Sequence, residues 1–498
     1  MDNLLSRMLT FPPHPPPQIP LSDQQYDEGI KAQIEIMKKM TEKNLLQSTS
    51  GGESPLDVIN PALNTVPYTF ILIAHIAAAQ NGDKNIDLEE LWGKVTGYLC
   101  SFDGRQIRYM GKELNRIMDA TAKLARQTRQ VRLLHQPEAA IQPIREAILR
   151  VDPSGSILTS THLFLVKLAL ETRQYESVVE VLDKHILYLP ARESISYTKF
   201  ICDVGLASSS YVTTLSGLTA RLSALEVLEY FFYSGMVYIG LQRWEAAFEM
   251  LENAVTYPSR DLGVSLPMVE AYKKWLLVGL LLEGKVVHLP KTTSHHAAKV
   301  YHTIAKPYEA VASIFESGSA SRLKSEIEHG QQIWTEDGNT GLMLCVLSTY
   351  QKSQIRNLAN VYSKIGVQEI NSLTTSAETG AKLPSAQKAE ELIQSMIGES
   401  TLHGNMLRDQ AGQTVLTFAP FGPQLSEAQI QKELVAATRH IQNLAAQIKT
   451  TDRILTHDKR FIESAQKAKK IAKANGSADV GMDWNTVIED EDIMTEMY

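Results

Sequence analysis

Apolar residues recur at spacings of three and four along most of the chain, which is the periodicity of amphipathic helices. From Asp57 onward this pattern dominates, and the alternation typical of strands is almost absent before residue 400. Ala, Leu, Gln, Glu and Lys fill the helical segments, while Gly and Pro stand at the joints between them. The pattern therefore predicts an all-α fold with a small β element late in the chain.

A short motif occurs twice in the helical part. Tyr175 and Trp244 each open a segment whose apolar positions fall four and seven residues later. The two aromatic residues are 69 positions apart, about twice the 34-residue period of tetratricopeptide helix pairs. Such helix pairs cannot bury their apolar faces alone, so they stack on one another. We therefore predict a helical-repeat solenoid of this type over residues 36–340.

The pattern changes near residue 340, and residues 341–420 form a second predicted unit. One amphipathic helix comes first, over 341–365, and two shorter helices follow at 367–373 and 386–397. Two strand-like segments, the second ending at Phe418, then predict a β-hairpin. Three helices followed by a hairpin is the order of elements in a winged helix.

A single long helix is predicted from Leu425 to Ile471, within a unit that spans residues 421–473. Its apolar positions approximate a heptad seam. A soluble monomer rarely exposes a long apolar patch, so this helix is expected to pack against partner helices. The candidate partner-interface residues on the seam are Leu434, Ile441, Leu444, Ile448, Leu455 and Ile462.

The last strand of the predicted hairpin supplies a second set of interface candidates. We expect it at a sheet edge, where unpaired backbone groups can bind another strand. The preceding helix carries Lys388 against Glu390 and Glu391, and phosphate would be repelled by that balance. We therefore expect the winged helix to bind proteins and not nucleic acid. The candidate residues on the strand are Val415, Leu416 and Phe418.

Both ends of the chain differ in composition from its body. Six prolines between Pro12 and Pro20 predict an extended, Pro-rich segment over residues 1–35. No basic residue follows Lys473, whereas seven acids do, so residues 474–498 are predicted to be a disordered acidic tail. The net charge of -7 thus belongs to the tail and leaves the body about neutral, which excludes a strongly basic nucleic-acid coat protein.

One basic stripe interrupts the neutral body. A helix predicted over residues 105–132 carries eight Arg or Lys side chains and only two acids. The functional interpretation is a contact for an acidic partner. The alternative, which we favour from the sequence, is a solvated face that balances acidic side chains elsewhere.

No catalytic, cofactor or metal site is predicted. The stretch from Gly279 to Val286 has the G-x4-G-K spacing of a phosphate loop. However, Val286 stands where Ser or Thr would hold magnesium, so a buried helix ending at Gly284 is the better interpretation. Four histidines between His288 and His302 have no carboxylate or thiol at ligand spacing.

The three cysteines are far apart, which excludes a disulfide scaffold and a cysteine-based zinc site. The N-terminal residues lack the pattern of a signal peptide, and the most apolar window is shorter than the roughly 20 residues of a membrane span. We therefore expect a protein of the cytoplasm and nucleus with no membrane contact.

The order of helical repeats, winged helix and long C-terminal helix resembles the PCI family. Its members are subunits of the proteasome lid, the COP9 signalosome and initiation factor 3. Two runs are the specific part of the resemblance, E-A-Y-K-K at Glu270–Lys274 and G-K-V-x-x-L-P-K-x-T-S at Gly284–Ser294. Both are similar to the subunit 3 branch of the signalosome proteins.

The resemblance implies a non-catalytic scaffold in the complex that removes the ubiquitin-like modifier Nedd8 from cullins. There the isopeptidase chemistry belongs to another subunit with a JAMM motif, which this sequence lacks. The implied partners are other PCI and MPN subunits and, indirectly, cullin-RING ubiquitin ligases, with no cofactor. The alternatives are a PCI subunit of the proteasome lid or of initiation factor 3, and a winged-helix RNA-binding adaptor.

Overall fold

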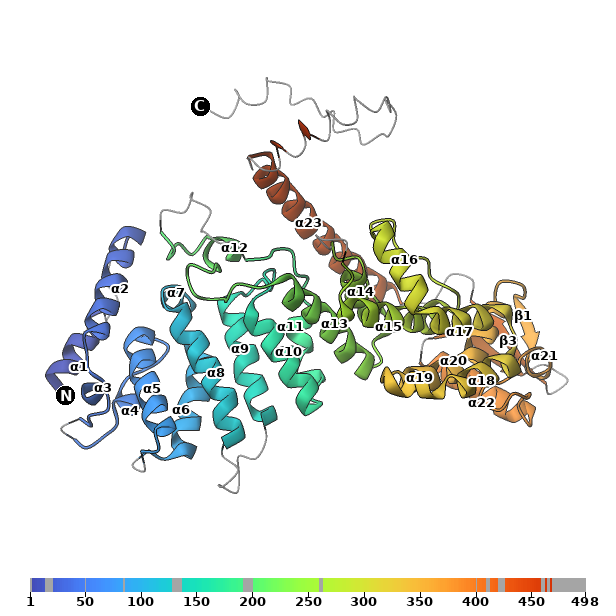
Figure 1. Cartoon of the computed structure of the whole chain (residues 1–498), viewed down its shortest axis with the longest axis horizontal. Helices are drawn as coiled ribbons and strands as arrows, with labels where there is room; N and C mark the ends of the chain where they lie inside the picture. The colour runs from blue at the N-terminus through green and yellow to red at the C-terminus, as the bar shows by residue number, and fades with distance from the viewer. Residues whose placement is uncertain are drawn as a thin grey trace.

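The computed structural model is an elongated row of helices that ends in a small sheet, with one long helix rising from its surface (Figure 1). It describes residues 2–13, 21–49, 51–83, 86–127, 137–190, 200–258, 263–399, 401–408, 413–419, 426–457, 462–463 and 466–467. The predicted all-α solenoid with a winged helix is confirmed. The predicted disordered tail at 474–498 lies outside the described residues.

The N-terminal end of the row is built around α5, whose sequence is apolar on nearly every side. Because α5 packs against α2, α6 and α8, it has no face that needs polar residues. The helices of this part are α1 (Asp2–Met8), α2 (Asp23–Lys38), α3 (Glu42–Leu45), α4 (Pro55–Val58), α5 (Thr65–Gln80), α6 (Leu88–Ser101), α7 (Gly104–Ile107) and α8 (Gly111–Gln127).

The predicted boundary at residue 35 is wrong, because α2 already belongs to the folded solenoid. Ser22 caps α2 in a capping box with Gln25, and Ile30 and Met37 are buried. Met8 of α1 is buried as well. The prolines mark only the short connection between these two helices, of which residues 14–20 lie outside the described part.

The middle of the row is a stack of helix pairs. Its elements are η2 (Pro137–Ala140), α9 (Ile141–Val151), α10 (Ser160–Thr172), η3 (Glu176–Val178), α11 (Val179–Leu182), α12 (Ser208–Tyr211), α13 (Ala224–Gly240), α14 (Trp244–Val255) and α15 (Leu266–Glu283). The repeated motif forms the turn of two pairs, since Arg173 and Gln242 both adopt a positive φ two residues before the aromatic residue. The Tyr175 ring lies so close to Gly240 that any Cβ there would clash with it, so neighbouring repeats interlock. The first copy continues only as η3 and α11, which are shorter than α14.

The E-A-Y-K-K run forms a polar cluster inside this stack. Lys273 Nζ lies 2.7 Å from Glu270 Oε1 and 2.8 Å from Asp337 Oδ2, and the Tyr308 hydroxyl donates to the same Asp337 oxygen at 2.6 Å. The cluster joins α15 to α17 and to the residues that precede α20. The later helices are α16 (His295–Ile304), α17 (Lys306–Ser317), α18 (Ala320–His329), α19 (Gln331–Glu336) and α20 (Thr340–Leu358).

The winged helix contains a strand that the sequence pattern missed. The helix predicted over 341–365 ends at Leu358, and a short strand follows before α21. This strand pairs with the hairpin to give a three-stranded antiparallel sheet in the order β1-β3-β2. The elements are β1 (Lys364–Gly366), α21 (Val367–Leu373), α22 (Ala386–Gly398), β2 (Gly404–Arg408) and β3 (Thr414–Phe418).

The G-K run is a helix end, as predicted. Helix α15 stops at Glu283, and Gly284 follows in the left-handed conformation with φ of 72°. Among the described residues, no group of three or more His, Cys, Asp or Glu side chains is arranged to hold a metal ion. None of the described helices is long and apolar enough to cross a membrane.

The predicted basic helix at 105–132 is two helices, α7 and α8, and residues 128–132 lie outside the described part. Arg105 pairs with Asp23 and donates to the Cys202 carbonyl at 2.7 Å. Arg108 donates to the Ile201 and Asp203 carbonyls. These two arginines therefore hold the loop that runs across α7.

Candidate functional site

The long helix α23 (Glu427–His457) projects from the row of helices (Figure 1). It begins after Ser426, whose hydroxyl accepts from the Gln429 N–H while the Gln429 side chain accepts from the Ser426 N–H. Every α23 residue with a described side chain is exposed except the half-buried Thr451. The predicted helix thus starts about where expected, and beyond His457 the described residues 462–463 and 466–467 are helical too.

The predicted seam of α23 lies open along its length. Leu434, Ile441 and Ile448, each seven residues apart, are 60%, 64% and 67% exposed. Leu444 and Ile462 are exposed as well, and the side chain of Leu455 lies outside the described part. Because heptad positions share one face of a helix, these side chains form a continuous apolar stripe. Such a stripe is the geometry of a helix that binds other helices.

The prediction that the last strand of the hairpin lies at the edge of the sheet is wrong. β3 is the centre of the sheet, since it pairs with β1 on one side and with β2 on the other. Leu416 and Phe418 are buried in the winged-helix core, and Val415 is half-buried. Leu416 and Phe418 therefore hold the winged helix together and are not available to a partner.

β1 and β2 are the two edge strands of the sheet, and β2 is the longer of them. The Ala419 N–H donates to the His403 carbonyl at 2.9 Å, so His403, Asn405 and Leu407 face β3 with their backbone groups. In an antiparallel ladder the alternate residues face away, and here these are Gly404, Met406 and Arg408. The unpaired backbone groups that the sequence assigned to β3 are thus found on β2.

The surface of α22 is acidic. Lys388 is the one cation of this helix, whereas Glu390 and Glu391 line a hollow of about 500 Å3 beside the sheet. The Thr414 hydroxyl donates to Glu390 Oε1 at 3.2 Å and fixes that carboxylate at the surface. A phosphate backbone would be repelled at the helix that reads DNA in other winged helices.

None of the three cysteine thiols, all of which lie among the described residues, is activated as a nucleophile. Burial raises the pKa of the Cys100 and Cys345 thiols, which disfavours the reactive thiolate. Cys202 is buried and donates to the Asp23 carbonyl at 3.2 Å.

The sequence was compared with known proteins. A family model described as COP9 signalosome complex subunit 3, N-terminal helical repeats, matches residues 28–297. A curated COP9 signalosome complex subunit 3 of Neurospora crassa is 33% identical over 94% of this chain and 92% of that protein. Its counterpart in Emericella nidulans is 30% identical over 95% of this chain and 93% of that protein. This chain belongs to the COP9 signalosome subunit 3 family.

Membership in this family makes the chain a signalosome subunit that works together with other subunits of the complex. The matched repeats begin inside α2, in agreement with the folded N-terminal helices. They also include the E-A-Y-K-K run, whose cluster packs α15 against the elements before the winged helix. The two likenesses to curated subunits continue through the winged helix and α23, where the candidate interface lies.

Proposed function

We propose that this chain is a non-catalytic scaffold subunit of the COP9 signalosome, the complex that removes Nedd8 from cullins in cullin-RING ubiquitin ligases. One observation carries the proposal, the uncovered apolar stripe of α23. A scaffold must offer a surface that becomes buried only on assembly. The stripe fits a bundle of equivalent helices from other PCI and MPN subunits.

The size of the stripe is sufficient for stable docking. Burying six apolar side chains contributes roughly 1.5–3 kcal/mol each, which gives on the order of 10 kcal/mol before the cost of ordering. The free β2 edge offers a second contact, through which winged helices of neighbouring subunits can pair. We place the chain in the cytoplasm and nucleus, where the complex would meet its ligases.

The test is the triple variant Ile441→Glu, Leu444→Glu, Ile448→Glu in the full chain. Three carboxylates in a buried seam remain unpaired, so incorporation into the complex should fall by at least tenfold. The matched control is Gln442→Glu, Lys449→Glu, Arg453→Glu, which adds three glutamates to the same helix outside the seam. Circular dichroism checks that both variants fold, and native mass spectrometry of the purified complex measures incorporation.

Normal incorporation of the seam variant would contradict docking through α23, and so would an equal loss in the control. The non-catalytic role has a separate measurement. The isolated chain should leave a Nedd8-modified cullin uncleaved, whereas the complete complex should cleave it. Salt-sensitive binding of RNA by the isolated chain, abolished by changes in α22, would favour the RNA-adaptor alternative instead.

A further inference from the structure

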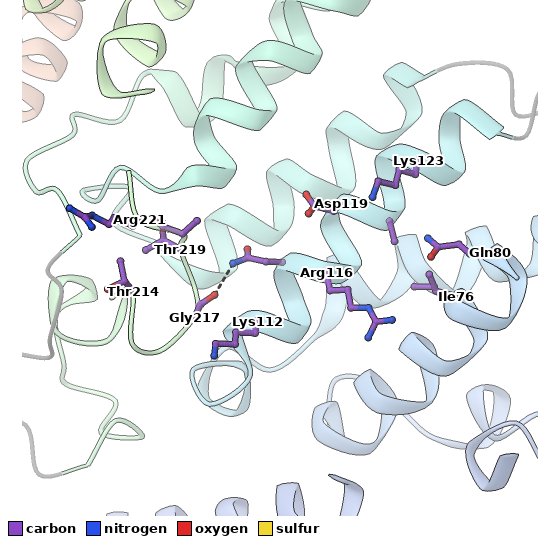
Figure 2. Close-up of a pocket in the computed structure, with 13 residues that line it drawn as sticks. Ile76, Gln80, Lys112, Arg116, Asp119, Lys123, Thr214, Gly217, Thr219 and Arg221 are labelled. Atoms are coloured by element: carbon purple, nitrogen blue, oxygen red, sulfur yellow. Dashed lines mark hydrogen bonds between the residues drawn. The ribbon is translucent and has the colours of Figure 1, made fainter. Parts of the chain in front are cut away.

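A basic groove of about 640 Å3 opens between α8, the end of α5 and the loop that precedes α13. Figure 2 shows Lys112, Arg116 and Lys123 on α8, with Arg221 on the facing loop. All four side chains are exposed, and Asp119 is the one acid among the lining residues. We call this site, defined by these four cations, the basic groove.

The groove has a built wall. The backbones of Gly217 and Gly111 are in close contact. A Cβ on Gly111 would clash with the backbone at Gly217, and a Cβ on Gly217 would clash with Lys112. The Asn115 amide donates to the Gly217 carbonyl at 2.7 Å and fixes the loop against α8. Two hydrogen bonds join the loop to the start of α10. The Ser160 N–H donates to the Thr219 hydroxyl, and the Ala220 N–H donates to the Ser160 hydroxyl. The four cations are therefore held around a preformed hollow.

These cations lack the partners that neighbouring basic residues have. Arg105 on α7 pairs with Asp23, and Arg126 at the end of α8 pairs with Glu171. Within the described part of the chain, no ion pair involves any of the four cations of the basic groove. Four like charges in one hollow repel one another, so the site favours a polyanionic occupant.

We propose that the basic groove binds the acidic C-terminal segment of the same chain, residues 474–498. That segment carries seven carboxylates and no cation, so it is complementary in charge to the groove. The contact needs only side-chain carboxylates and does not require regular structure in the segment. It also explains why a chain with a nearly neutral body keeps a basic stripe in one place and an acidic stretch in another.

The attachment of α23 supports a contact within one chain. The Thr451 hydroxyl lies 3.1 Å from the Tyr188 hydroxyl, and the Tyr188 N–H donates to the Ser156 carbonyl. Ser156 precedes Ser160, which anchors the wall of the groove, so Thr451 brings α23 into contact with the solenoid close to that wall. Asp479 lies 12 positions after residue 467, the last described helical residue, and an extended chain spans roughly 3.3 Å per residue. A tether of this length keeps the local concentration of the acidic segment high.

The test is zero-length carbodiimide cross-linking of the isolated full chain, which joins a carboxylate to a lysine amine only when the two are in contact. We expect cross-links from acids between Asp479 and Glu496 to Lys112 and Lys123, weaker at high salt. The variant Arg116→Glu, Arg221→Glu leaves both lysines in place and should lower their cross-link yield roughly fivefold. The matched control, Lys299→Glu with Arg322→Glu, reverses two exposed cations outside the groove and should leave the yield unchanged.

A second variant leaves the groove intact and changes the other partner, with Glu489→Gln, Asp490→Asn, Glu491→Gln and Asp492→Asn. It should reduce the cross-links from Asp479 and Asp483, because fewer charges hold the segment in place. An equal mixture of isotopically light and heavy chains separates contacts within and between copies. Cross-links spread evenly over exposed lysines, an unchanged yield in the groove variant, or mixed-isotope products would each overturn the proposal.

Discussion

At the scale of single residues, two buried polar sites bear on stability more than on partner binding. Burial opposes the charge of Lys273, but hydrogen bonds with Asp337 and Glu270 outweigh it and raise the pKa of this lysine. Burial alone would raise the pKa of Asp337, but the hydrogen bonds from Lys273 and Tyr308 outweigh burial and hold this pKa below its usual value. His162, in contrast, is fully buried, and burial lowers its pKa to about 4 although the Asp152 carboxylate opposes the shift. Both sites lie inside the stacked repeats.

The variant Lys273→Met should lower the free energy of unfolding by about 2 kcal/mol, because the half-buried Glu270 and Asp337 each lose a charged hydrogen-bond donor. Lys285→Met is the matched control. Lys285 pairs with Glu283 at 3.3 Å on an exposed surface, where loss of the pair costs under about 1 kcal/mol. Denaturant unfolding of both variants measures the difference, and equal losses would contradict a structural role for the cluster.

His162 predicts how the solenoid responds to acid. Below about pH 6.5 the unfolded chain binds a proton on this histidine, while the folded chain does so only near its pKa of about 4. Stability is therefore lost as pH falls through this window. Between about pH 7.5 and about pH 5 the parent should lose about 2 kcal/mol more than His162→Gln. The Gln side chain can still accept the Thr159 N–H bond that His162 accepts at 3.3 Å. His296→Gln, at the exposed start of α16, controls for removal of a histidine, and equal pH profiles for parent and His162→Gln would contradict the prediction.

At the scale of elements, the shorter helices of the winged helix were predictable, and the order of the strands in its sheet was not. The predicted helices at 367–373 and 386–397 match α21 and α22 to within one residue, because each has apolar positions at helical spacing over about two turns or more. β1 has three residues, too few to show an alternation. Yet pairing with β1 makes β3 central, and it leaves β1 and β2 as the edge strands.

The β2 edge leads to a prediction about assembly. Met406→Pro removes a backbone donor that faces away from β3, so the sheet should keep its ladder while pairing with a neighbouring subunit weakens several-fold. Arg408→Pro, at the exposed end of β2, repeats the test without loss of a packed side chain. Asn405→Pro is the contrast, because its N–H faces β3 and its loss should destabilise the hairpin itself. Copurified complex at normal yield from folded Met406→Pro and Arg408→Pro chains would show that the edge is unused.

At the scale of the whole molecule, the described residues form two hydrophobic cores that meet along α20. Leu342, Val346 and Tyr350 belong to the solenoid core, whereas Ile355 on the same helix belongs to the core of the winged helix. The winged-helix core also contains Leu416 and Phe418. Separate cores predict separate cooperative units, with α20 as the shared element.

Thr417→Pro tests this division. Thr417 lies opposite both Lys364 and Asn405 in the sheet, so a proline there breaks the central strand. Amide hydrogen exchange should become faster over residues 364–418 and stay unchanged in α5, α10 and α13. Faster exchange throughout the solenoid would show instead that the molecule unfolds as one unit. Incorporation into the complex should fall as well, through loss of the winged helix.

The sequence by itself determined the helical class, the repeat architecture, the winged helix and the seam of α23. These follow from local periodicity, and a stripe such as Leu434, Ile441 and Ile448 is visible in one dimension because a helix repeats every few residues. The tertiary structure alone decided that β3 is central, that α2 belongs to the solenoid, and that the cations of α8 meet Arg221 in one groove. Each of these depends on contacts between residues far apart in the chain, whose register and spacing no local pattern encodes.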